Sequence, residues 1–103
     1  MYLNMTAEQY DFACECAKYC FEDWRTVFRD DGYEDFAIAL GLAASFKLKL
    51  SHMDPPTKEE LEGFLTWIED QRDALEDIDP AELEADDRKA LAGFRELIAA
   101  LAK

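Results

Sequence analysis

Three cysteines, at Cys14, Cys16 and Cys20, are the first residues whose side chains could do chemistry. Zinc sites usually pair their ligands as C-x2-C and add a second pair elsewhere, and this spacing does not match that arrangement. On a helix, Cys16 and Cys20 are neighbours, whereas Cys14 points about 160° away from Cys16. The three thiolates could not converge on one ion. We therefore interpret them as small buried hydrophobic residues and expect Cys16 to be the most exposed of the three.

The remaining polar residues do not form a catalytic or metal-binding pattern either. His52 is the only histidine, which excludes a multi-histidine zinc site or a paired di-iron site within one chain. The acidic segment 30–35 has carboxylates suited to calcium, but not in the order of an EF-hand loop. Phosphate-binding glycine loops and the G-x-S-x-G nucleophile pattern are absent from the sequence. We predict no enzymatic activity, no metal and no cofactor.

Negative charge is the one positive signal in the sequence. The chain holds 24 acidic and 11 basic residues, a formal net charge of −13, and the segment 69–87 alone has ten acids and one base. Seven acids of the helix expected at 57–78 fall on the face opposite its apolar stripe, and we call them the acidic face. They are Glu59, Glu62, Glu69, Asp70, Asp73, Glu76 and Asp77.

The density of charge on this face is comparable to that of a nucleic-acid strand. From Glu59 to Asp77 a helix rises about 27 Å, at ~1.5 Å per residue. Seven charges over that length give one per ~4 Å, close to the ~3.4 Å per charge along one DNA strand. The acidic face could therefore occupy a groove that evolved to bind nucleic acid. The alternative interpretation is a solvated outer face that only aids solubility.

The elements that must position these residues are all helical. Capping boxes at Thr6 and Thr57, together with the apolar periodicity behind them, predict helices over about 6–29, 33–52, 57–78 and 80–102. The sequence Asp79-Pro80 is a further helix start, so a short helical turn could precede the last helix. Because the connections are short, consecutive helices should be antiparallel. We predict an all-α, compact four-helix up-down bundle and a single acidic helical domain spanning 1–103.

The first two predicted helices differ in how their apolar residues are distributed. The first has one stripe, which consists of Tyr10, Ala13, Cys14, Ala17, Phe21, Trp24 and Phe28. The second is apolar on every side between Phe36 and Ala44, so it must be covered all round. It is therefore either the central helix of the bundle or partly a surface for another subunit.

Self-association is the second binding mode that the sequence indicates. Three aromatic residues, Phe12, Tyr19 and Trp67, lie off the main stripes of their helices. Patches of that kind commonly mark interfaces. Together with the all-round apolar helix they favour a homodimer or larger assembly. The candidate contact residues are Phe36, Ile38, Leu40, Leu42 and Phe46.

Composition also limits the partners and the location. A chain with this net charge lacks the cations that binding to phosphates or to an anionic membrane requires, so we expect neither nucleic acid nor membrane as a direct partner. The longest nearly apolar run, 36–46, is too short to cross a bilayer, and the first five residues do not resemble a secretion signal. An odd number of crowded cysteines is not a disulfide framework, and we expect a reducing, cytoplasmic location.

In size, charge and helicity the chain resembles a broad class of small acidic inhibitors, which includes anti-CRISPR proteins, DNA mimics and bacteriocin immunity proteins. The resemblance is one of class only: no motif of these families matches, and no functional residue is carried over. It implies a non-enzymatic binding module whose partner is a protein with a basic, nucleic-acid-binding surface. The alternative is a homo-oligomeric structural or regulatory subunit that associates through an apolar helix face.

Overall fold

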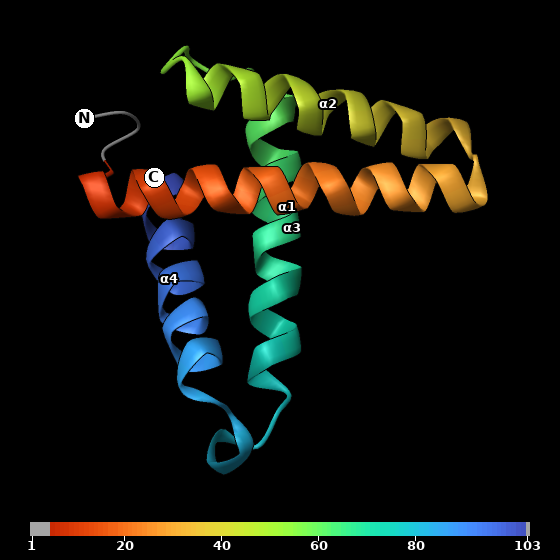
Figure 1. Ribbon diagram of the computed structural model, residues 1–103. Helices are drawn as coiled ribbons and strands as arrows, with labels where there is room; N and C mark the ends of the chain where they lie inside the picture. Colours follow the sequence, from red (N-terminus) through yellow and green to blue (C-terminus); the bar gives the residue numbers. More distant parts are fainter. Residues whose placement is uncertain (1–4, 103) are drawn as a thin grey trace.

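The computed structural model describes residues 5–102, and within them it contains four α-helices and one short 3-10 turn (Figure 1). The elements are α1 (Ala7–Asp31), α2 (Glu34–Ser51), α3 (Lys58–Glu76), η2 (Pro80–Glu82) and α4 (Ala85–Leu101). The predicted all-α four-helix bundle is confirmed, as is the helical turn before the last helix.

Two capping boxes begin α1 and α3 where the sequence predicts them. The hydroxyl of Thr6 accepts from the Gln9 amide at 3.1 Å, and the Gln9 side chain accepts from the Thr6 amide at 3.0 Å. Thr57 and Glu60 make the same reciprocal pair at the start of α3. Each box satisfies two backbone N–H groups that the first turn leaves without partners. The starts of both helices are therefore determined locally.

The connections within each pair of helices are short. Gly32, with φ of 69°, adopts the left-handed conformation that ends α1, and α2 begins two residues later. Between α3 and α4 the 3-10 turn starts after Asp79, whose side chain accepts from the Ala81 amide at 3.0 Å. The Arg88 guanidinium donates to the Pro80 carbonyl at 3.0 Å and ties this turn to α4. α1 and α2 form one antiparallel pair, and α3 and α4 form the other (Figure 1).

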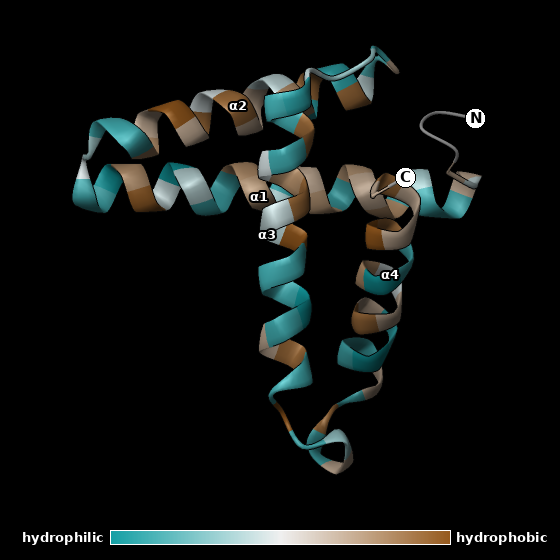
Figure 2. Ribbon diagram, turned by 180° about the vertical axis from the view of Figure 1, so that it is seen from behind, coloured by the Kyte–Doolittle hydropathy of each residue, from teal (hydrophilic) through white to brown (hydrophobic). Residues whose placement is uncertain are grey.

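The second pair lies across the first, so consecutive helices are antiparallel within each pair, as expected, but α2 and α3 are not (Figure 1). Figure 1 shows α3 passing behind α1 near its middle, and the reverse view in Figure 2 shows α3 in front. The molecule measures 40 × 35 × 19 Å, so its thickness is that of two layers of helices ~10 Å across. The C-terminal half of α1 and the N-terminal half of α2 extend beyond the crossing and pack on each other there (Figure 1).

The core lies where the two pairs cross. Phe46 of α2 and Phe64 of α3 pack with ring centroids 4.5 Å apart. All four helices contribute to the buried cluster, which also includes Met5 from before α1. Its members are Met5, Ala13, Cys16, Ala17, Cys20, Phe46, Leu50, Phe64, Ile68, Leu97 and Leu101.

The buried side of α1 differs from the predicted stripe. Cys16 and Cys20 are each only 3% exposed, whereas Cys14 is half-buried, so the expectation that Cys16 is the most exposed cysteine is wrong. α1 packs against α2 on one side and against α3 and α4 on another. Because two layers meet it, the buried side shifts from Cys14 toward Cys16 and Cys20.

Candidate protein-binding surfaces

The acidic face lies along the outward side of α3. Its side chains are exposed except for that of Glu69, which is half-buried. The buried residues of the same helix, Glu60, Phe64 and Ile68, follow one another at intervals of four on the opposite side. Because α3 has a single inward side, the seven acids of the face fall on the outward side, two of them at the start of the helix and five between 69 and 77. This placement agrees with the expected register.

Basic side chains neutralise only part of this face. Arg72 contacts Asp73 at 3.0 Å and Glu76 at 3.4 Å, and Arg95 of α4 contacts Glu76 at 2.8 Å. Lys58 lies 3.9 Å from Glu62. Exposed pairs of this kind contribute about 0–1 kcal/mol each. In the described part of the chain, four of the seven carboxylates have no Lys or Arg nitrogen within 4.0 Å: those of Glu59, Glu69, Asp70 and Asp77.

Negative charge is unevenly distributed among the helices. α3 carries seven acids and two bases, and the segment 77–84 after it adds four acids and no base. By contrast, α2 carries two acids and two bases. The α3–α4 pair therefore holds the strongest negative potential, and α2 is electrostatically close to neutral. Attraction of a basic partner would be directed to α3 and the turn that follows it.

Glu60 is the one acid of α3 that is buried, and it is tied to α2. Its carboxylate accepts from Lys49 Nζ at 2.8 Å, from the Thr57 amide at 2.7 Å and from the Ser45 hydroxyl. Burial alone would raise the pKa of Glu60, but these hydrogen bonds favour the ionised form and lower the pKa to about 2. Within residues 5–102, no buried polar side-chain atom lacks a partner. Glu60 therefore joins two helices and is not part of the exposed face.

The structure separates the five candidate self-association residues. Ile38 is 59% exposed on the outer side of α2, whereas Phe46 is 1% exposed in the core. The other three, Phe36, Leu40 and Leu42, are half-buried. α2 packs against α1 and α3 at the edge of the molecule, so it is not the central helix. Only part of the set is thus available for an external contact.

Leu48, on the outer side of α2, was not singled out from the sequence. It is 59% exposed, and Gly41 is exposed between Ile38 and Leu48. All three follow at intervals of three and seven, which places them on one side of the helix. This outer side could have been identified from the sequence as the side of the helix that lies opposite Phe46 and Leu50, the two buried residues of α2.

Two of the three off-stripe aromatics are half-buried and pack against side chains of the same molecule. The Phe12 ring lies against Phe94 of α4, with centroids 5.5 Å apart. Trp67 stacks on Phe64 at 6.5 Å and donates from Nε1 to Asp23 Oδ2 at 3.0 Å. Only Tyr19, 64% exposed, stays on the surface. Of the three aromatics, only Tyr19 therefore still supports self-association.

The chemistry of the cysteines and of His52 follows from their positions. Burial raises the pKa of Cys16 and of Cys20 to about 12, so both thiols are protonated at neutral pH. His52 is exposed at the end of α2, where its amide donates to the Leu48 carbonyl at 3.1 Å. Among the described residues, no three His, Cys, Asp or Glu side chains are grouped so that they could hold a metal ion.

Neither the helices nor the comparisons with known proteins point to a family. Over residues 5–102, each helix is too short or too polar to cross a bilayer. Comparison with protein-family models, with curated proteins and with solved structures finds no match. The functional argument therefore depends on the surfaces alone.

Proposed function

We propose that this chain is a non-enzymatic, acidic protein-binding module that masks the basic, nucleic-acid-binding surface of a partner protein. The functional class is that of small inhibitors such as anti-CRISPR proteins, DNA mimics and immunity proteins. We also propose a cytoplasmic location. The observation that carries the proposal is the acidic face of α3: seven carboxylates along one outward side, four of them without a basic side chain within 4.0 Å in the described chain.

The close spacing of like charges on α3 supports binding over mere solvation. Like charges three and four positions apart destabilise a helix by a few tenths of a kcal/mol each, and Asp70, Asp73 and Asp77 follow at those intervals. Folding does not require this arrangement. A basic groove would relieve the repulsion, and long-range attraction would raise the association rate more than the affinity.

The test is capture of a partner from native lysate at low and at high salt, followed by its identification. The bait is compared with a face variant, Asp70→Lys, Asp73→Lys and Asp77→Lys. A matched control, Glu8→Lys, Glu15→Lys and Glu96→Lys, changes the net charge equally at exposed positions outside α3. We expect capture at low salt, loss at high salt, loss with the face variant and retention with the control.

Masking is then measured directly on the captured protein. Its binding to nucleic acid should be inhibited by the wild-type chain in a competitive manner, and not by the face variant. Equal capture by the face variant and the control would overturn the assignment to α3. Capture of a partner whose nucleic-acid binding is unaffected would overturn the masking role.

Homo-oligomerisation through α2 is the second candidate, favoured by the exposure of Ile38 and Leu48 on a helix that is electrostatically close to neutral. Light scattering on the pure protein at two salt concentrations tests it, because apolar association does not weaken with ionic strength. An assembly that persists at high salt and dissociates with Ile38→Lys would support this candidate. A monomer at all concentrations would contradict it.

A further inference from the structure

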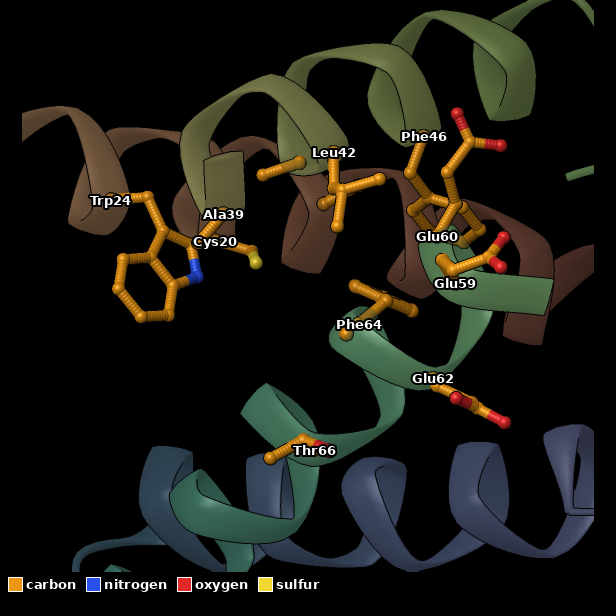
Figure 3. A pocket seen from close by; sticks show the side chains of 13 residues that line it. Cys20, Trp24, Ala39, Leu42, Phe46, Glu59, Glu60, Glu62, Phe64 and Thr66 are labelled. Carbon is orange, nitrogen blue, oxygen red and sulfur yellow. The ribbon is translucent and has the colours of Figure 1, made fainter. Parts of the chain in front are cut away.

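An apolar cavity lies where α3 crosses the α1–α2 pair. Its volume is about 320 Å³, near the small end of the ~300–1,000 Å³ range of ligand pockets. Figure 3 shows its walls: Cys20 and Trp24 come from α1, Leu42 and Phe46 from α2, and Phe64 from α3. Trp24 and Leu42 remain half-buried, so part of their apolar surface still faces water.

Small residues on all three helices keep the cavity open. Ala17, Ala39, Ala43 and Gly63 line it, and a Cβ atom built on Gly63 would meet nothing within 4 Å. A glycine inside a helix costs roughly 0.5–1 kcal/mol relative to alanine. Neither packing nor helix stability requires glycine at this position. Because Gly63 lines the cavity and is exposed, a larger side chain there would take up open space at its wall.

The walls also carry negative charge. Glu59 and Glu62 of the acidic face line the cavity, and among the described residues no Lys or Arg lines it. Glu59 has no basic nitrogen within 4.0 Å in the described chain, and Glu62 has only the exposed Lys58 at 3.9 Å. In the view of Figure 3 their carboxylates lie on the far side of Phe64 from Trp24. Thr66 continues the same side of α3 toward Asp70. The cavity is therefore continuous with the start of the acidic face.

A second cavity of about 350 Å³ shares Trp24 with the first. It is lined by Asp23, Thr26, Val27, Trp67 and Trp24 itself. Asp23 is exposed and accepts the hydrogen bond from Trp67. A segment lying along the two cavities would thus meet Asp23 near Trp24, and Glu59 and Glu62 beyond Phe64.

We infer that this cavity receives one apolar side chain of a basic protein segment, with Lys or Arg residues on both sides of that side chain. The inference rests on the proposed function and names the contact by which the partner is anchored. A charged face alone gives attraction without a fixed register, whereas an apolar anchor in a desolvated pocket supplies binding energy and position. A second copy of this chain is a poor occupant, because it would bring another net charge of −13 to acidic walls.

Two synthetic peptides test the inference without a known partner. One is an acetylated, amidated Lys-Arg-Leu-Arg-Lys, and the other has Ala in place of Leu. Neither peptide contains tryptophan, so the fluorescence of Trp24 and Trp67 reports binding, and amide NMR shifts locate it. We expect the Leu peptide to bind about tenfold more tightly, since burial of the larger side chain removes more apolar surface from water. The affinity of both should fall with salt, while their ratio should not.

A variant whose side chain fills the cavity provides the complementary test on the protein side. Gly63→Leu adds a side chain where a Cβ atom meets nothing within 4 Å, and Gly41→Leu does so on the outer side of α2, away from the cavity. Both replace a helical glycine, so both should fold at least as stably as the wild type. We expect Gly63→Leu to reduce the Leu-to-Ala affinity ratio to about one, and Gly41→Leu to leave it unchanged. The ratio on the wild-type protein remains decisive if either variant fails to fold.

The outcomes separate the two proposals. Equal, salt-sensitive binding of both peptides by the wild type would overturn the cavity as an anchor site and leave the acidic face intact. If neither peptide binds in a salt-sensitive way, the proposed function is overturned together with this inference. A Leu preference that survives Gly63→Leu, with NMR shifts elsewhere, would assign the anchor to another surface and overturn the site.

Discussion

Lys49 Nζ of α2 lies 2.8 Å from Glu60 Oε1 of α3, and this ion pair joins the two helix pairs near the place where they cross. Glu60 is 4% exposed, and its carboxylate also accepts from Ser45 and from the Thr57 amide. The same residue closes the capping box of α3. One side chain therefore serves both the start of a helix and the contact between helices.

This contact makes a pH-dependent contribution to stability. The pKa of Glu60 is about 2 in the folded state, below its ordinary value of 4.5, so its stabilisation is present above about pH 4.5 and is lost as the pH falls toward 2. We expect Glu60→Gln to lower the free energy of unfolding by roughly 2–3 kcal/mol at neutral pH. The difference from wild type should shrink as the pH falls, in urea titrations at several pH values.

The comparison with a neighbouring glutamate isolates this effect. Protonation of the many exposed acids relieves repulsion in wild type and variant alike, so only the difference between them reports Glu60. Glu59→Gln changes the same charge at an exposed position one residue earlier and should show no such loss at neutral pH. A Glu60→Gln difference that is independent of pH would contradict the ion-pair explanation.

The helical glycines Gly63 and Gly93 should respond oppositely to alanine. A Cβ atom at Gly93 would lie 2.6 Å from Phe12 Cε2 and 2.9 Å from Cζ, whereas one at Gly63 would meet nothing within 4 Å. We expect Gly63→Ala to stabilise the fold by about 0.5–1 kcal/mol. Gly93→Ala should be less stable than Gly63→Ala by about 1–3 kcal/mol, because the Phe12 ring must shift. Thermal unfolding of the two variants measures this.

The Phe12 ring identifies the cause. In a Phe12→Ala background the close contact is gone, so Gly93→Ala should recover the gain in helix stability. A penalty for Gly93→Ala that persists without the Phe12 ring would place its origin elsewhere in α4.

Two acids at opposite ends of α3 should affect stability with opposite signs. Glu59 is in the first turn, where a negative charge interacts favourably with the helix dipole, and Asp77 is at the C-terminal end, where it does not. We expect Asp77→Asn to stabilise the protein by about 0.3–1 kcal/mol and Glu59→Gln to be neutral or destabilising. Urea unfolding at low ionic strength compares them. Stabilisation of similar size by both would indicate general charge repulsion instead.

The three thiols should react at different rates. Cys16 and Cys20 are 3% exposed, and burial raises the pKa of each to about 12, whereas Cys14 is half-buried. In native protein we expect a thiol reagent to modify Cys14 first and the other two only after unfolding. Denaturant should expose all three. Cys14→Ser should remove the early reaction, and an early reaction that remains would mean that another cysteine becomes accessible in the native state.

The helices and their starts could be predicted from the sequence because their causes are local. The hydroxyls of Thr6 and Thr57 cap residues only three positions away. Six exposed or half-buried acids of α3, together with Asp77 at its C-terminal end, share one side because the helical period determines which residues face the same way. The acidic face and the four helices thus follow from the order of residues, without knowledge of the packing.

The crossing of the two helix pairs, and everything that depends on it, was decided by the tertiary structure. The angle between packed helices depends on how side chains of both interdigitate, which the periodicity of one helix does not encode. The crossing buries Cys16 and brings Lys49 within contact of Glu60. It also places the Phe12 ring against Phe94. The cavity between Trp24 and Phe64 forms at the same crossing. Each of these contacts joins residues from different helices, so only the folded chain brings them together.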